Sequence, residues 1–256
     1  DCQMNWNPEQ YLKFADARQR PALDLLARLD GRSASRIVDL GCGAGNITQL
    51  LAERWPSAQI IGVDSDSAML AKAAATAPMI DWRRAEISSW QADFPPDLIF
   101  SNAVLHWLDD HLQLLPQLLG QLVKGGMLAV QMPANFNAPS HRILRELAAK
   151  TEWREVLGGV RMGCVLSAAE YQQLLTPHCR HLELWETTYW QLLSGDDAVF
   201  EWMKGSTLVP YLARLDSAAA ERFLAIYRER LRTTYLRQPD GHVLFPFKRL
   251  FFVAQS

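Results

Sequence analysis

Between residues 36 and 133 the sequence alternates short apolar runs with segments of helical periodicity. The apolar runs have the length and aliphatic content of buried strands, and most are followed by a stretch in which apolar residues recur every three or four positions. Strands that alternate with helices predict βαβ units with right-handed crossovers and a parallel sheet. The predicted strands are 36–40, 59–64, 81–86, 97–104 and 127–133, and the predicted helices are 46–55, 67–77 and 111–123.

The rest of the chain has a looser pattern. Pro21 divides a helical pattern at residues 8–29 into two short helices. Two more strands are expected at 182–193 and 242–255, separated by helical patterns in two pieces over 197–236. We therefore predict an α/β fold, a Rossmann-like, seven-stranded, mainly parallel sheet with a helical cap. The predicted parts are an N-terminal helical cap segment at 1–30, an α/β core at 31–133, cap and substrate segments at 134–180 and 194–240, and the final strands at 181–193 and 241–256.

Composition limits the partners that the chain can have. Lys and Arg number 26 against 28 Asp and Glu, so the chain lacks the electrostatic footprint of a nucleic-acid or anionic-membrane binder. Its apolar stretches are far shorter than the roughly 20 residues of a membrane span. We expect a small-molecule substrate, no nucleic acid, no membrane and a monomer.

The ends and the cysteines predict a location. No secretory signal is visible, and the three residues that precede Met4 do not look native. Without them the cysteines are odd in number and lack metal-type spacing, which predicts a reduced, cytoplasmic protein without a metal site. The remaining cysteines are Cys42, Cys164 and Cys179.

A glycine-rich stretch, "DLGCGAGN" at residues 39–46, follows the first predicted strand. Its glycines, Gly41, Gly43 and Gly45, allow a tight turn and leave no Cβ to block a ligand. The helix expected from Asn46 would point its free N–H groups at the same place. Because ligands of open parallel sheets bind beyond the carboxyl ends of the strands, we expect a binding site here.

The spacing of the glycines in this loop helps to distinguish between classes of nucleotide cofactor. Asp64 ends the second strand, where a carboxylate can accept both hydroxyls of a ribose. A dinucleotide fingerprint reads G-x-G-x-x-G, whereas this loop reads G-x-G-x-G after Asp39. An acid beside the ligand suits a cationic amino-acid group better than a pyrophosphate, which disfavours a nicotinamide-dependent oxidoreductase. The alternative, in which the glycines only form turns and Asp64 only caps a helix, stays open at this point.

Four motifs in order resemble class I S-adenosylmethionine-dependent methyltransferases. They are "VDLGCGAG", "GVDSDSAML", "AEI" at 85–87 and "DLIFSNAVLHWL" at 97–108. The resemblance implies S-adenosyl-L-methionine as cofactor, with S-adenosyl-L-homocysteine as its product. A complete first motif argues against a non-catalytic binding module. The residues implied to bind the cofactor are Asp39, Gly41, Cys42, Gly43, Gly45, Asn46, Asp64, Ser65, Met69, Glu86, Ile87, Asn102, Ala103 and Trp107.

A closer resemblance covers most of the chain from residue 5 on and is to trans-aconitate 2-methyltransferases. It is carried by segments such as "SNAVLHWLDDH", "GGMLAVQMPANFNAPSH" and "WMKGSTLVPYL". It implies methylation of a carboxylate on a small polycarboxylic acid. The chain keeps Arg18, Arg20 and Arg249, but it carries Val209 where the family pattern has an arginine suited to clamp a carboxylate. This departure suggests an alternative acceptor that is less anionic, either heteroaromatic or phenolic, with O- or N-methylation.

A carboxylate acceptor needs no general base, whereas a phenol or an acidic N–H can need one. His106, just after the fourth strand, is the best-placed base, although a helix-start role explains it equally well. Cys42 is expected to be a small filler rather than a nucleophile. For each aromatic residue below, ordinary core packing is the competing interpretation. The residues expected to bind the substrate are Trp6, Tyr11, Phe14, Arg18, Trp107, His141, Tyr189, Val209, Tyr211 and Arg249.

Overall fold

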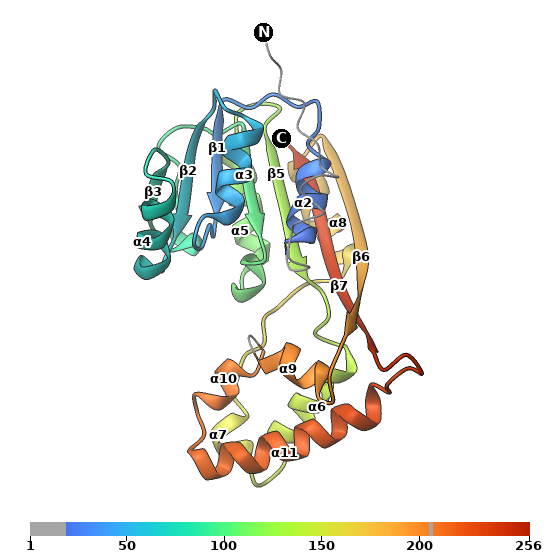
Figure 1. Cartoon of the computed structure of the whole chain (residues 1–256). Coiled ribbons are helices and arrows are strands. Elements are labelled where there is room, and N and C mark those ends of the chain that lie inside the picture. The colour runs from blue at the N-terminus through green and yellow to red at the C-terminus, as the bar shows by residue number, and fades with distance from the viewer. Residues whose placement is uncertain (1–18, 205–206) are drawn as a thin grey trace. The chain divides into compact units, whose positions relative to one another are not determined.

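The computed structural model describes residues 19–204 and 207–256 and divides into two compact units (Figure 1). Unit 1 comprises the described residues up to Met132 together with Cys164–Glu186 and Leu250–Ser256. Unit 2 comprises Pro133–Gly163 and Thr187–Arg249. Four of the predicted substrate residues, Trp6, Tyr11, Phe14 and Arg18, lie outside the described residues.

A seven-stranded sheet has the order β3-β2-β1-β4-β5-β7-β6. The pairs β3–β2, β2–β1, β1–β4 and β4–β5 are parallel, as the alternating pattern predicts. The predicted fold class is therefore confirmed, and the strand bounds agree closely with the predicted ranges. The strands are β1 (Arg36–Leu40), β2 (Gln59–Asp64), β3 (Asp81–Arg84), β4 (Leu98–Asn102), β5 (Met127–Pro133), β6 (His181–Leu193) and β7 (Val243–Gln255).

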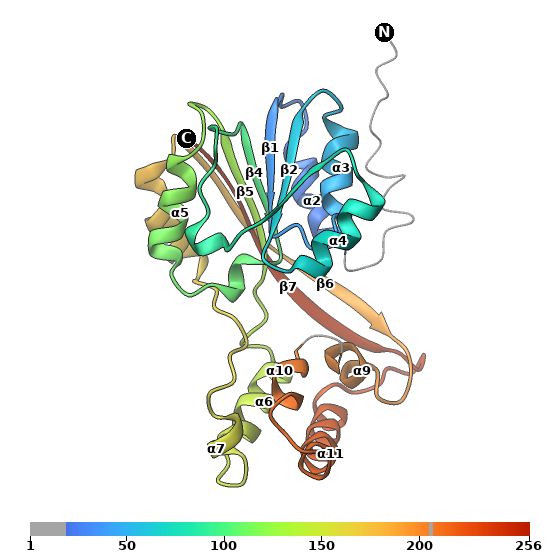
Figure 2. The same cartoon turned by 90° about the vertical axis from the view of Figure 1, so that its left-hand side faces the viewer.

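Helices cover both faces of the sheet in unit 1. Figure 2 shows α2, α3 and α4 on one face and α5 on the other, with α8 beside α5. The strands between these layers are almost wholly buried, because β1, β4 and β5 must be apolar toward both helix layers. The helices are α2 (Arg20–Ala27), α3 (Asn46–Arg54), α4 (Ser67–Thr76), α5 (His111–Gly120) and α8 (Ala168–Leu175).

The position of α8 differs from the predicted division of the chain. The sequence placed all of 134–180 in the cap, whereas Cys164–Glu186 belongs to unit 1. The reason is visible in the contacts of α8, since Tyr171 is fully buried and bonds to His111 at the start of α5. A short helix with one apolar face carries no signal of which surface that face will cover.

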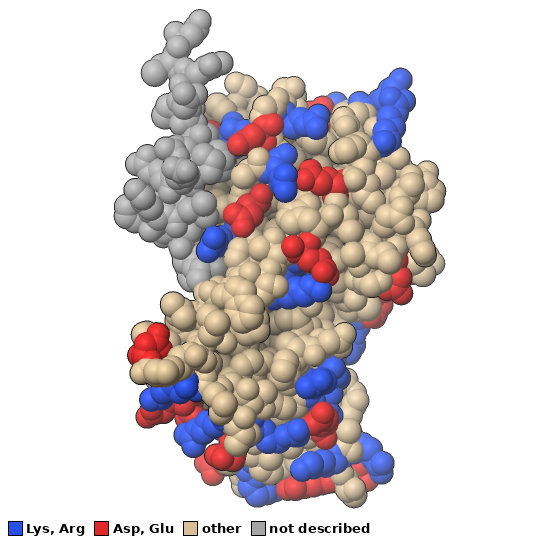
Figure 3. Space-filling model, turned by 90° about the vertical axis from the view of Figure 1, so that its right-hand side faces the viewer, with Lys and Arg blue, Asp and Glu red and all other residues tan. Residues whose placement is uncertain are grey.

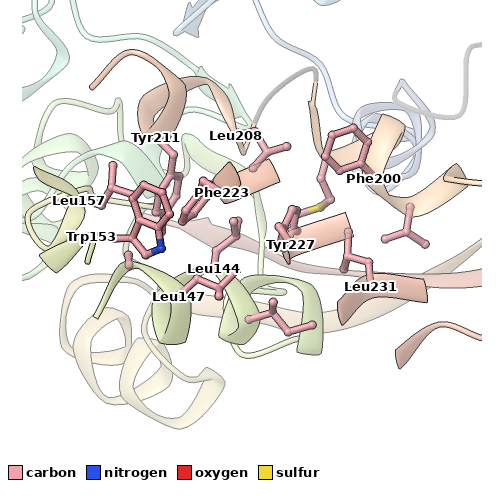
Figure 4. Packing of buried hydrophobic residues seen from close by; sticks show 14 of the residues in the cluster. Leu144, Leu147, Trp153, Leu157, Phe200, Leu208, Tyr211, Phe223, Tyr227 and Leu231 are labelled. Atoms are coloured by element: carbon pink, nitrogen blue, oxygen red, sulfur yellow. The ribbon is translucent and has the colours of Figure 1, made fainter. Parts of the chain in front are cut away.

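Unit 2 has a hydrophobic core of its own, built from helices and from parts of β6 and β7 (Figure 4). Phe223 of the long helix α11 lies at its centre, with Trp153 edge-on at 5.4 Å and Tyr211 stacked at 5.9 Å between ring centroids. The sequence predicts two helical pieces over 197–236, and the structure has three described helices there because Pro210 and Asp216 start separate ones. The helices are α6 (Pro139–Ala148), α7 (Arg154–Leu157), α9 (Ala198–Lys204), α10 (Val209–Leu212) and α11 (Ser217–Thr234).

The charged side chains of unit 2 are largely paired with one another. Arg232 of α11 binds Asp197, and Arg230 binds Glu146 of α6. Figure 3 shows basic and acidic side chains interspersed over the face that it draws. Among the described residues, no helix is long and apolar enough to cross a membrane.

Candidate functional site

The glycine loop joins β1 to α3 at the carboxyl end of the sheet. Gly41 and Cys42 both donate their backbone N–H to the carbonyl of Val63 at 2.8 and 3.0 Å, so the loop is bound to the end of β2. All the loop glycines have positive φ angles, 85° at Gly41, 54° at Gly43 and 81° at Gly45. Side chains other than glycine are strained at these angles, so the tight turn that the sequence predicts is present.

The three glycines have different reasons to be glycine. A Cβ on Gly41 would come within 2.4 Å of Val104, and one on Gly45 within 2.5 Å of the Trp82 ring. These two glycines are required by contacts inside the protein. A Cβ on Gly43 would meet nothing within 4 Å. The backbone at Gly43 is therefore the part of the loop that is open to a ligand.

Asp64 is bonded both to the glycine loop and to the residue that caps the helix after it. Its Oδ2 accepts the N–H of Gly43 at 2.8 Å, and its Oδ1 accepts the N–H of Asp66 at 2.9 Å. The N-cap of α4 is Asp66, whose carboxylate accepts from the N–H groups of Ala68 and Met69. A carboxylate oxygen can accept more than one hydrogen bond, so Asp64 retains acceptor capacity for the hydroxyls of a ribose.

A cavity of ≈220 Å³ opens beside the loop. The predicted residues Asp39, Gly41, Cys42, Asn46 and Asn102 all line it. Its lining also includes Gln19, Ala44 and Ile47, which no sequence pattern had indicated. A cavity at the carboxyl ends of β1 and β4 is where an α/β sheet binds its ligand.

Asp39 is a buried acid next to this cavity. It is 2% exposed, and its Oδ2 accepts the hydroxyl of Thr48 at 2.6 Å. Burial raises the pKa of Asp39 to about 7; the Thr48 hydrogen bond opposes the rise and the charge of Asp64 adds to it. A carboxyl group held in this state gains from a cationic partner, as the sequence analysis expected of an acid in this loop.

Cys42 is a buried residue of the same loop. Burial raises the pKa of its thiol, and the charges of Asp39 and Asp64 raise it further. Because the thiolate is the nucleophilic form, this environment suppresses its reactivity. The geometry fits the small filler that the sequence predicts.

The end of β4 lies beside the glycine loop and contributes Asn102 to the cavity. Asn102 Oδ1 accepts from Nε2 of the buried Gln131 at 2.6 Å, and Ala103 donates its N–H to the Gln131 carbonyl at 2.9 Å. Ala103 has a φ of 56°, the only positive value of a described non-glycine residue. Strained backbone of this kind concentrates at functional sites, and here it directs Val104 against Gly41.

His106 and Trp107 lie in the short 3-10 helix η2 (Leu105–Trp107) that follows β4. His106 is 5% exposed and its ring centroid lies 4.7 Å from that of Trp107, which is 49% exposed. The backbone carbonyl of His106 accepts the N–H of Cys164 at 2.7 Å. The exposed indole of Trp107 is thus available to a ligand, whereas the imidazole of His106 is shielded from solvent.

Leu105, His111 and Tyr171 form a buried chain of hydrogen bonds next to η2, called the relay below, which the sequence did not predict. His111 Nε2 bonds to the carbonyl of Leu105 at 2.8 Å, and His111 Nδ1 bonds to the hydroxyl of Tyr171 at 2.7 Å. The carbonyl can only accept, so Nε2 carries the proton and Nδ1 accepts from Tyr171. The Tyr171 oxygen also accepts the N–H of Leu166 at 3.3 Å. This relay ties the conformation of η2 to α5 and α8.

Of the remaining predicted cofactor residues, Ser65, Glu86 and Ile87 follow the ends of β2 and β3, and Met69 lies in the first turn of α4. The Asp64 carbonyl accepts the N–H of Ala85 at 3.0 Å, and Arg84 Nε donates to the carbonyl of Ser65 at 3.1 Å. The segment of Glu86 and Ile87 therefore lies beside the end of β2. Their environments differ as follows: Ser65 and Glu86 are exposed, Met69 is 38% exposed and Ile87 is buried.

The predicted substrate residues of unit 2 have different environments. Tyr211 is 1% exposed and stacks in the core of unit 2, and burial raises its pKa to about 12. His141 is 3% exposed, and burial together with the charge of Arg145 lowers its pKa to about 4, so it is neutral at pH 7. Tyr189 is 5% exposed, whereas Val209 at the start of α10 is 55% exposed.

Arg249 of β7 is desolvated. Burial lowers the pKa of its guanidinium to about 10, and its central carbon lies 4.4 Å from the ring centroid of Phe247. The group remains charged at neutral pH. A guanidinium in this state gains more from a carboxylate than an exposed one does.

Comparisons with known proteins agree with this geometry. Residues 37–126 match the methyltransferase domain family. The plantazolicin methyltransferase BpumL in complex with S-adenosylhomocysteine has the same fold, with a TM-score of 0.51 and 16% identity over 96% of this chain and 84% of that chain. The fold and the site define a class I methyltransferase that uses S-adenosyl-L-methionine.

Two curated relatives extend the match over nearly the whole chain. The trans-aconitate 2-methyltransferase of Azoarcus sp. (strain BH72) is 48% identical over 97% of this chain and 98% of the relative. The trans-aconitate 2-methyltransferase of Methylobacterium nodulans is 45% identical over 98% of both chains. The chain belongs to the trans-aconitate 2-methyltransferase family.

Proposed function

We propose that this enzyme transfers a methyl group from S-adenosyl-L-methionine to a carboxylate of trans-aconitate. The observation that carries the acceptor is the near full-length identity to relatives named for that reaction, 48% and 45% in the two described above. The less anionic acceptor suggested by Val209 is not favoured, because relatives at this level of identity are named for a tricarboxylate.

The residues that would hold the cofactor are those whose geometry fits it. The open backbone at Gly43 provides a cradle without a Cβ, and the carboxylate of Asp64 is oriented beside it by two backbone N–H groups. Asp39 would face the cationic amino-acid end, and the indole of Trp107 offers an apolar surface to the adenine or to the acceptor. The remaining predicted contacts, from Asn46 and Ser65 to Ile87, follow from the same arrangement of strand ends.

The chemistry that the cofactor supplies is a methyl group on a sulfonium, which is already activated toward displacement. A carboxylate is ionised at neutral pH and attacks without a base. The protein's task is therefore to align the two reactants and exclude water. With a carboxylate substrate, His106 has a packing role at the site and does not accept a proton. Its role as a general base stays a prediction that applies only to a methyl acceptor with a proton to lose.

The acceptor would bind to cationic and polar groups. Arg249 is the desolvated guanidinium described above, and Tyr189 lies within electrostatic reach of it. Arg18 and the aromatic residues at the start of the chain stay proposals from the resemblance. We also propose that the enzyme acts as a cytoplasmic monomer without a nucleic-acid partner. The paired charges of unit 2 support only the last of these, because they leave no basic stripe on its described helices.

Product analysis tests the acceptor. The enzyme is incubated with methyl-labelled S-adenosyl-L-methionine and one candidate acceptor at a time. The acceptors are trans-aconitate, cis-aconitate, citrate, a phenol and an N-heterocycle. Mass spectrometry and NMR then locate the label. We expect a monomethyl ester of trans-aconitate. Label on the phenol or heterocycle with none on trans-aconitate would contradict the proposed acceptor while leaving the methyltransferase class intact.

A further inference from the structure

The side-chain amide of Asn135 in unit 2 is buried. Asn135 follows β5 by two positions and is 5% exposed. Its Nδ2 has no partner among the residues that the structure describes. An unsatisfied buried donor costs free energy in the folded protein, so each instance calls for an explanation. A ligand that accepts from the amide would provide one.

The backbone places Asn135 beside the end of β7. Ala134 donates its N–H to the carbonyl of Lys248 at 2.9 Å. Lys248 stands between Phe247 and Arg249 in β7, so this bond brings the backbone of Asn135 next to that part of the strand.

This part of β7 holds a group suited to an anion. The guanidinium of Arg249 lies over the ring of Phe247 at 4.4 Å and is desolvated. A carboxylate offers about four lone-pair positions, so it can accept two N–H groups from an arginine and a further one from an amide. An amide adds a directed donor without adding charge.

We propose that Asn135 is a substrate-binding residue whose Nδ2 donates to the carboxylate of the acceptor that Arg249 binds. This inference rests on the proposed function, because it assigns one contact of the polycarboxylate acceptor. In the enzyme without substrate, the Nδ2 of Asn135 then lacks an acceptor, and the bound carboxylate supplies one.

Two substitutions at Asn135 separate a binding role from a structural one. Asn135→Leu removes the amide at similar volume, so stability is retained or increased because an unsatisfied buried donor is lost. The same variant raises KM for trans-aconitate about 10-fold with little change in kcat, as expected for lost ground-state and transition-state binding. Asn135→Asp places an anion beside Arg249 and raises KM by about 100-fold or more, since it repels the carboxylate.

Asn137→Asp is the matched control. Asn137 lies in the same segment, is exposed, and its Oδ1 accepts from Arg145 at 3.5 Å, a contact that an aspartate preserves. We expect wild-type kinetics for this variant. The dissociation constant of S-adenosyl-L-homocysteine, measured by calorimetry, stays unchanged in all three variants.

The outcomes distinguish this inference from the proposed function. If Asn135→Leu has the wild-type KM, or if its melting temperature and its affinity for S-adenosyl-L-homocysteine fall together, Asn135 is structural and the inference is wrong. If the wild-type enzyme neither binds nor methylates trans-aconitate, the proposed acceptor is wrong and this contact is wrong with it.

Discussion

The carboxylate of Asp64 accepts the backbone N–H of Gly43 at 2.8 Å. This bond connects the end of β2 to the one glycine of the loop that has open space beside it. The carboxylate of Asp64 and the open backbone at Gly43 therefore have a fixed relative position before any ligand binds. Preorganisation of this kind reduces the free energy spent on ordering when the cofactor binds.

Replacement of Asp64 by alanine tests this relationship. We expect affinity for S-adenosyl-L-homocysteine to fall by on the order of 2–4 kcal/mol, because two ribose hydroxyls and the N–H of Gly43 lose their acceptor. Titration calorimetry measures the change. Asp66→Ala is the control, since it removes the N-cap of α4 and costs about 1 kcal/mol of stability without touching the ribose. Equal affinities for the two variants would contradict the assignment.

Replacement of Gly43 by valine separates ligand contact from backbone strain. The new side chain would project into open space, so circular dichroism should show a retained fold and calorimetry should show no cofactor binding. Gly31→Val is the matched control, because Gly31 also has a positive φ, 74°, and open surroundings. It should lose similar stability and bind normally. Loss of fold and binding together at Gly43 alone would make that glycine structural.

Replacement of Asp39 by asparagine tests the raised pKa. A folded pKa of about 7 against 3.8 means that stability from neutral Asp39 is complete below pH 4 and is lost as pH rises through 7. Asparagine can still accept from Thr48 and avoids the buried charge. The variant should therefore match the wild type near pH 4 and exceed it by on the order of a few kcal/mol at pH 8.

The same variant should bind the cofactor product more weakly. The ammonium group of the cofactor product favours ionised Asp39, so the wild-type affinity should increase between pH 6 and pH 8, and this increase should be absent with asparagine. Denaturant titrations and calorimetry across this range provide both readouts. A wild-type affinity that is flat with pH, alongside an unchanged stability difference, would show that Asp39 is ionised throughout.

Replacement of Tyr171 by phenylalanine tests the relay behind η2. His111 Nδ1 and the N–H of Leu166 both lose their partner, so we expect a loss of about 1–3 kcal/mol in urea denaturation. Tyr227→Phe in unit 2 removes a hydroxyl that donates only to the Ser140 carbonyl, and it should cost less. Equal losses would show that the relay has no special contribution.

The strand ends could be predicted from the sequence because their signals are local. Gly41, Asp64 and Asn102 each follow an apolar run, and parallel strands bring their carboxyl ends to one edge. The sequence pattern does not distinguish the three glycines of the loop, however. Gly43 differs from the other two because Val104 packs against Gly41 and Trp82 packs against Gly45. That distinction depends on contacts that no pattern encodes.

The parts that could not be predicted depend on long-range packing. The relay joins Leu105, His111 and Tyr171, and the last is 60 positions from His111. Tyr211 was expected at the substrate site, and it stacks on Phe223 in the core of unit 2. An aromatic residue has the same local pattern in a core as in a pocket, so burial alone decides its role.

The specificity constant of the wild-type enzyme for trans-aconitate shows directly whether trans-aconitate is the methyl acceptor. Initial rates are measured with saturating S-adenosyl-L-methionine, and the product ester is quantified by mass spectrometry. We expect kcat/KM of about 10⁴ M⁻¹s⁻¹ or above, the range of an enzyme acting on its own substrate, and much lower values for phenols and N-heterocycles. A value for trans-aconitate far below that of a neutral acceptor would contradict trans-aconitate as the acceptor.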